Sequence, residues 1–290
     1  MKFSILSVVV FAVFASIVPS RAYAISDSEI TAAQINLLKE RIARLERAST
    51  PPEDPAAAGR LVAQRYADAI ISVKGTALMR VTIGERTMPP REQKIDVNGT
   101  VITATGLVVT SWNGLDVRAT FEALRSQINT NQPVDLGKTD FKLLRIRLND
   151  GTEVPVKIAS KDPERDLVFL APVDDSVANR HPFTFVDLNG AREGAAVLGN
   201  YYQVSRADEL IQRALLVRAC TVNAILERPR RLLLVSTNSF ADTLGCPIFD
   251  SHGKVVGICL HYVDAGLPKG TVVLPAADVA AGAADAFSQQ

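Results

Sequence analysis

Hydrophobic residues in the larger, C-terminal part of the chain come in short β-branched runs separated by Gly, Asn, Asp and Pro. From Ile70 on, the runs are AIISVKG, GTVITATGLVVTS, LLRIRLNDGTEVPVKIAS, DLVFLAPV, AAVLGN, RALLVRACTVNAIL, RLLLVST, CPIFDSHGKVVGICL and GTVVLPA. Many short strands at close spacing are typical of a sandwich or barrel. The pattern therefore predicts an all-β fold for this part of the chain.

Two of these runs contain a tight turn, and one stretch between runs has a different period. LNDGTEVPV places Asp-Gly, which suits a positive φ, between two strand-like segments and predicts a hairpin. FDSHGKVV predicts a second hairpin. The stretch DVRATFEALRSQI, Asp116–Ile128, has helical spacing instead, so we expect a helix inserted between two strands.

A third pattern, with helical period, occupies Ser26–Ser49. Its apolar positions alternate in steps of three and four and form one seam: Ile35, Leu38, Ile42 and Leu45. The seam covers about two heptads, which is marginal for a free-standing coiled coil. The helix therefore either docks on its own domain or frays as a stalk, or it is a short oligomerisation helix. In the last case residues 28–48 would join copies of the chain into a homo-oligomer.

The stretch after this helix is rich in proline. Thr50–Gly59, TPPEDPAAAG, has no periodicity, and its prolines cannot continue a helix, so it predicts a linker. Together with the preceding helix it forms a segment of residues 25–59. Arg60–Ala69 is expected to be a second short helix before the strands begin.

The first 24 residues have the composition of a targeting segment. Lys2 is followed by an almost wholly apolar run, Phe3–Val18, and then by the small–x–small sequence of residues 22–24. This is the pattern of a cleaved secretory signal. The alternative is an uncleaved anchor helix, although the run is shorter than the ~20 residues that a span usually needs. Either interpretation places the remainder outside the cytoplasm, periplasmic or secreted.

Composition and charge narrow the function classes. A chain of 290 residues can hold one large β domain or two small ones. A net charge of +1 gives no basic field, so we expect no nucleic-acid partner. The three histidines lie in no metal-ligand motif, and we expect neither a metal nor a cofactor. Of the three cysteines, at most one pair can form a disulfide within the chain.

Six segments resemble, in the same order, those of the trypsin-like serine proteases of the bacterial HtrA/Deg type. They are GTVITATGLVVTSWNG, KDPERDLVFL, LGNYY, ACTVNAIL, DTLGCPIFDSHGKVVGI and GTVVLPAADV. Of these, ACTVNAIL is similar to the strand that opens the second barrel. They cover about residues 66 to 280. The resemblance implies two packed six-stranded barrels over residues 60–290, with the active site between them. The HtrA type usually carries a C-terminal PDZ domain, and we expect none here.

The resemblance assigns the three positions of a catalytic triad. The family's histidine falls on Asn113, its aspartate on Asp166 and its serine on Leu244. An amide has no nitrogen that can accept a proton, and leucine has no nucleophilic atom. Asp166 either keeps the place of the orienting carboxylate or is an ordinary turn residue before an apolar strand.

The oxyanion hole is also altered. The family's hole would use the backbone N–H groups of Asp242 and Leu244. A carboxylate side chain at Asp242 would oppose the negative charge that develops there. The base and the nucleophile are replaced as well. The sequence therefore predicts a pseudoprotease, which keeps the fold but has lost peptide hydrolysis. Such a protein would act by binding a protein or peptide, which the sequence does not identify.

The alternative function is an active serine- or cysteine-type endopeptidase with a rearranged site. Cys246 lies two residues past the nucleophile position, and His261 lies on the strand that borders the substrate pocket in active relatives. A Cys246–His261 dyad is therefore one possibility. Otherwise Cys246 is a small buried residue or pairs in a disulfide with Cys220 or Cys259.

Overall fold

The computed structural model divides the chain into two units, Met1–Ser49 and Thr50–Gln290. It describes residues 54–125, 132–137, 139–190, 199–207, 209, 212–236, 243–264 and 267–288. The predicted signal sequence, the predicted helix of residues 26–49 and Asp242 lie outside these residues. In the described part of the chain, no helix combines the length and the apolar character needed to span a membrane.

The first barrel is closed by six antiparallel strands. In spatial order they are β1 (Ile70–Met79), β4 (Arg91–Val101), β5 (Val108–Ser111), β9 (Leu167–Pro172), β8 (Glu153–Asp162) and β7 (Asp140–Arg147). The ring closes where β7 returns to β1, with Ile146 opposite Val73. Both side chains are fully buried in the barrel core, together with Val168 and Leu170 of β9.

The second barrel has the same number of strands. In spatial order they are β10 (Asn200–Arg206), β11 (Leu215–Leu226), β12 (Leu232–Val235), β15 (Leu267–Pro275), β14 (Val255–Asp264) and β13 (Pro247–Asp250). The predicted pair of six-stranded barrels is thus confirmed. Its first strand is β10, however, and not the ACTVNAIL segment of β11. The polar Gln203 and Ser205 interrupt the apolar pattern of β10, yet both are completely buried.

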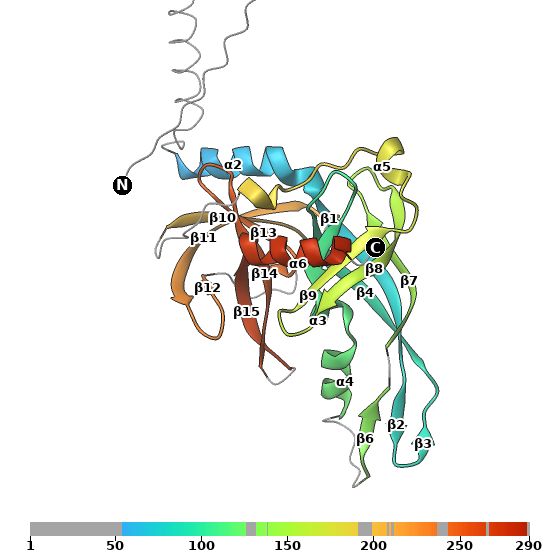
Figure 1. Cartoon of the computed structure of the whole chain (residues 1–290). Coiled ribbons are helices and arrows are strands. Elements are labelled where there is room, and N and C mark those ends of the chain that lie inside the picture. The colour runs from blue at the N-terminus through green and yellow to red at the C-terminus, as the bar shows by residue number, and fades with distance from the viewer. Residues whose placement is uncertain are drawn as a thin grey trace, which may run out of the picture. The chain divides into compact units, whose positions relative to one another are not determined.

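A shared apolar cluster joins the two barrels. It contains Val109 and Phe169 from the first barrel and Phe249 and Ile258 from the second. The closing helix α6 (Ala276–Ser288) lies against strands of both barrels, as Figure 1 shows. Its Val279 belongs to this cluster. The packing of one barrel on the other therefore sets the geometry of any site between them.

Both predicted hairpins are present. The β7–β8 turn places Arg147 opposite Glu153, and Gly151 adopts a φ of +88°. The β13–β14 turn uses Gly253 at a φ of +74°. The small sheet of β2 (Val81–Ile83), β3 (Arg86–Thr87) and β6 (Val134–Leu136), which extends from the first barrel in Figure 1, was not expected from the sequence.

The helices agree with the sequence in part. The inserted helix is present as α4 (Arg118–Arg125), after a single turn, α3 (Trp112–Leu115). The remaining short helices are α5 (Val177–Arg180) and the 3₁₀ turns η1 (Ala67–Ala69) and η2 (Leu188–Gly190).

The linker prediction for Thr50–Gly59 is wrong at its C-terminal end, because helix α2 already begins at Pro55 and runs to Tyr66. The Asp54 side chain caps it by accepting the Ala56 N–H at 2.9 Å. A proline at the first helical position loses no hydrogen bond, since the N–H there has no partner inside the helix.

Candidate functional site

The three triad positions assigned from the sequence lie on elements that meet between the barrels. Asp166 stands just before β9 with a φ of +59° and is fully buried. Its carboxylate Oδ1 accepts the backbone N–H of Asn113 at 2.7 Å and the side-chain Nδ2–H of Asn113 at 2.8 Å. Its Oδ2 accepts the Ser111 hydroxyl at 2.7 Å and the backbone N–H of His261 at 2.6 Å.

Each of these four groups acts as a donor to Asp166. The direction of the Ser111 bond follows from its second contact, because Ser111 Oγ accepts the N–H of Gly114 at 3.1 Å and gives its own proton to Asp166. A carboxylate has about four acceptor positions, so the acceptor capacity of Asp166 is filled. Three donors come from the first barrel and one, His261, from β14 of the second. Asp166 thus fastens the two barrels together.

Asn113 reproduces one half of an imidazole. Its Nδ2–H points at the Asp166 carboxylate, as a histidine N–H does in a serine-protease triad. Asn113 lies in the single turn α3, and the Ser111 side chain caps the start of this turn and so fixes the position of Asn113. The other half of an imidazole, a nitrogen that accepts a proton, has no counterpart in an amide. Asn113 therefore holds structure but cannot act as the general base that a histidine provides in such a triad.

The loop that carries Leu244 is bound to both barrels. Gly245 donates its N–H to the Cys259 carbonyl at 2.8 Å, and its own carbonyl accepts the Thr100 hydroxyl at 2.7 Å. Leu244 is 6% exposed, so its side chain belongs to the packed interior. Asp242, the other oxyanion-hole position, lies outside the described residues.

Gly245 also makes the closest approach to the strand that leads into the site. A Cβ at this position would lie 2.3 Å from the Asn98 carbonyl and 2.7 Å from Thr110 Oγ1. Thr110 itself donates to the Asn98 carbonyl at 2.6 Å and is followed directly by Ser111, which bonds Asp166. The structure therefore brings Asn113 and Asp166 into contact and places the Leu244 loop on the strand beside them.

Gly245→Ala is expected to lower the free energy of unfolding by about 2–4 kcal/mol, because the new methyl group meets backbone at a positive φ of +76°. Urea unfolding measures this change. Gly151→Ala is the matched control, since its φ of +88° is equally strained but open space surrounds it. We expect the control to lose only about 1 kcal/mol. Equal losses in the two variants would contradict the close approach.

The residues of the alternative dyad lie in different surroundings. Cys246 is fully buried in the shared cluster, where a substrate has no access to its thiol. His261 is partly exposed, and its Nδ1 lies 3.4 Å from the Gly270 carbonyl. None of the three cysteines, which all fall within the described residues, forms a disulfide. Burial raises the pKa of the Cys220 thiol to about 11 and that of Cys259 to about 12.

Two donors at this site were not anticipated from the sequence. Ser111 could have been found as a helix cap, because serine before a helical turn is a preferred N-cap. The backbone N–H of His261 carries no sequence signal, since every residue except proline has this group. Its contact with Asp166 spans 95 positions of the chain and depends on how the barrels pack.

Comparison with known proteins identifies the family and the fold. A family model described as the trypsin-like peptidase domain matches residues 97–258, more than half of the chain. No curated protein sequence matches.

Solved structures of similar fold include HtrA-type proteases. The serine endoprotease of Yersinia pestis superposes with a TM-score of 0.52 at 14% identity, over 79% of this chain and 66% of that one. The HtrA-type protease AlgW with a tripeptide gives a TM-score of 0.51 at 14% identity, over 79% of this chain and 63% of that one. The chain thus spans just under two thirds of the length of these proteins.

A shorter relative is covered more completely. The active form of the Rv3671c protease of M. tuberculosis gives a TM-score of 0.51 at 15% identity, over 81% of this chain and 87% of that one. Identities this low speak for the fold, which is the double barrel described above.

Proposed function

The chain belongs to the trypsin-like peptidase domain family, and we propose that it is a secreted, catalytically inactive member that acts by binding a protein or peptide. Its proposed location is outside the cytoplasm, after removal of residues 1–24. A homo-oligomer formed through residues 28–48 is part of the same proposal. The double barrel of HtrA-type proteases is the scaffold on which the ligand would be held.

The observation that carries the proposal is the pairing of Asn113 with Asp166. The carboxylate that would orient an imidazole is occupied instead by an amide and three other donors. Removal of the nucleophile or the base alone reduces turnover by about 10⁶ in a protease with this chemistry. Here Asn113 and Leu244 replace both groups, and Leu244 packs into the interior. Binding is the property of the scaffold that needs neither group.

The proposal is tested by incubating the purified mature chain with labelled casein, beside serine-directed and thiol-directed activity probes. We expect no casein turnover above a buffer blank and no probe labelling. Trypsin serves as the positive control, and Cys246→Ala as the matched variant. Turnover that disappears in Cys246→Ala would identify a cysteine protease instead. Turnover that survives Cys246→Ala would exclude both the pseudoprotease and the Cys246–His261 dyad.

A further inference from the structure

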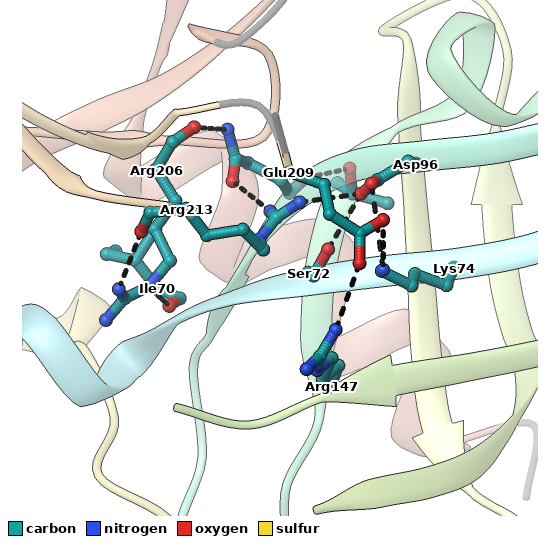
Figure 2. Close-up of polar contacts among 10 residues, drawn as sticks. Ile70, Ser72, Lys74, Asp96, Arg147, Arg206, Glu209 and Arg213 are labelled. Carbon is teal, nitrogen blue, oxygen red and sulfur yellow. Dashed lines mark hydrogen bonds and ion pairs between the residues drawn. The ribbon is translucent and has the colours of Figure 1, made fainter. Parts of the chain in front are cut away.

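A cavity of about 270 Å³ lies away from the triad positions, between the end of β7 and the β10–β11 connection. Three of its lining residues are arginines and one is an acid; the lining comprises Arg147, Leu148, Asn149, Gly151, Arg206, Glu209, Gln212 and Arg213. Figure 2 shows this cluster, in which arginines from the second barrel meet polar side chains on β1 and β4 of the first. The cavity is therefore built by both barrels and is rich in positive charge.

The guanidinium of Arg206 donates its hydrogen bonds to neutral carbonyl groups. Its Nε donates to the Ile70 carbonyl at 2.8 Å, and its Nη2 donates to the Ala67 carbonyl at 2.9 Å. It forms no ion pair with any of the described residues. Burial, and after it the neighbouring charge of Arg213, lowers the pKa of Arg206 below its ordinary value. The charge of Asp68 acts on this pKa in the opposite direction, but Asp68 forms no ion pair with Arg206, so Arg206 adds positive charge to the cavity.

Arg213 holds the second barrel to the first. Its Nη1 donates to Asp96 Oδ1 at 2.8 Å and its Nη2 to Asn98 Oδ1 at 3.1 Å. Its Nε is buried, and the described residues supply no acceptor for it. Gln212 and Arg213 both adopt positive φ angles, 56° and 51°, which are uncommon for residues other than glycine. A backbone strained in this way is frequently found where a side chain must be held for binding.

Glu209 is the acid that faces these cations. Its carboxylate lies between Lys74 Nζ at 2.9 Å and Arg147 Nη1 at 3.2 Å, as Figure 2 shows. The hydrogen bond from Lys74 is the main reason that the pKa of Glu209 lies below its ordinary value. The Glu209 side chain is 59% exposed, whereas that of Lys74 is only 18% exposed. The Lys74 ammonium is thus largely buried, and the Glu209 carboxylate contacts it from the solvent side.

This asymmetry makes Glu209 replaceable. Exposed ion pairs are weak because water screens them and a long side chain must be ordered. Lys74, by contrast, lies largely inside the cluster, and a largely desolvated cation favours an anionic partner. Its other carboxylate neighbour, Asp96, is farther away at 3.9 Å and is bonded more closely by Arg213 at 2.8 Å. A carboxylate from another molecule could take the place of Glu209 and would find the same two donors. The cavity beside them leaves room for the rest of its side chain.

We propose that this cavity binds a carboxylate side chain of an acidic peptide, with Lys74 and Arg147 as its partners, and that Glu209 is an internal occupant which the peptide displaces. The site is separate from Asn113 and Asp166, so the proposal does not depend on the loss of hydrolysis. It does connect to that region, because Asn98, which bonds Arg213, is also the residue against which Gly245 packs.

The test is the fluorescence anisotropy of a labelled tetraglutamate peptide, with tetraglutamine of the same length for comparison, at physiological ionic strength. We expect the chain to bind tetraglutamate in preference to tetraglutamine. Glu209→Gln is expected to tighten tetraglutamate binding about fivefold, and Arg147→Gln to weaken it about fivefold, the range of one exposed ion pair. Both side chains are at the surface, so both variants are expected to fold.

Arg145→Gln is the matched control. It removes the same charge from the same strand, but Arg145 pairs with Glu153 and does not line the cavity. We expect its affinity to stay within about twofold of wild type, because the charge of Arg145 is already paired with Glu153. Binding seen only in Glu209→Gln would support the proposal. Equal affinity for the two peptides, an equal loss in Arg145→Gln, weaker or unchanged binding in Glu209→Gln, or no binding by any variant would overturn it.

Discussion

Replacing Asn113 with histidine and Leu244 with serine is expected to restore little peptide hydrolysis, although, with Asp166, all three residue types of the triad are then present. The imidazole would take over the donor position that Asn113 Nδ2 now has on Asp166, at 2.8 Å. By the resemblance, however, Asp242 would supply one backbone N–H of the oxyanion hole and keep its carboxylate nearby. A carboxylate there raises the energy of the negatively charged intermediate, which the site must stabilise.

Adding Asp242→Gly to this double variant is expected to raise kcat by about 10²–10³, the range that one group of an oxyanion hole contributes. The measurement is hydrolysis of a fluorogenic peptide together with active-site titration. The same background with Leu244→Ala in place of Leu244→Ser is the control, since it lacks a nucleophile and should stay inactive. Strong activity in the double variant alone would show that Asp242 does not block the site.

Asp166→Ala is expected to lower the free energy of unfolding by about 3–5 kcal/mol. The change leaves four donors from three residues, Asn113, Ser111 and His261, without their acceptor inside the protein. Each buried donor that loses its partner costs about 1–3 kcal/mol, partly offset by relaxation. For a domain of this size the melting temperature should fall by about 10 °C.

Urea and thermal unfolding measure this effect, and Asp264→Ala provides the comparison. Asp264 is an exposed acid on β14, the strand that also carries His261. Its removal should change the free energy of unfolding by about 0.5 kcal/mol or less. If Asp166→Ala were no more destabilising than Asp264→Ala, the carboxylate would not be fastening the two barrels, and its four hydrogen bonds would have to be reassigned.

Much of the fold could be predicted because its signals are local. The turn in LNDGTEVPV needs a residue at positive φ, and Gly151 adopts it. Short β-branched runs between such turns predict many short strands, and the structure forms two barrels of six strands each. The order of the motifs then identified the barrel type. The assignment of Asn113 and Asp166 to triad positions stays a prediction, and the two residues are in direct contact.

Other features could not be predicted because the decisive contacts are distant in the chain. Gln203 and Ser205 are polar, so the sequence NYYQVSR does not have the apolar pattern of a core strand. Both residues are nevertheless fully buried in the second barrel. Helix α2 starts five residues earlier than expected because Asp54 caps it, a local signal that the prolines obscured.

The sequence alone determined what the side chains at two positions can do chemically, because a nucleophile or a base is a property of one side chain: Leu244 has no nucleophilic atom and Asn113 no proton-accepting nitrogen, whatever the fold. The tertiary structure decided what the remaining groups do. The role of a buried carboxylate depends on the hydrogen-bond donors that packing brings to it, and Asp166 accepts hydrogen bonds from both barrels. The cavity lined by Arg147, Arg206 and Arg213 exists for the same reason, since electrostatic interaction depends on distance in space and not on distance along the chain.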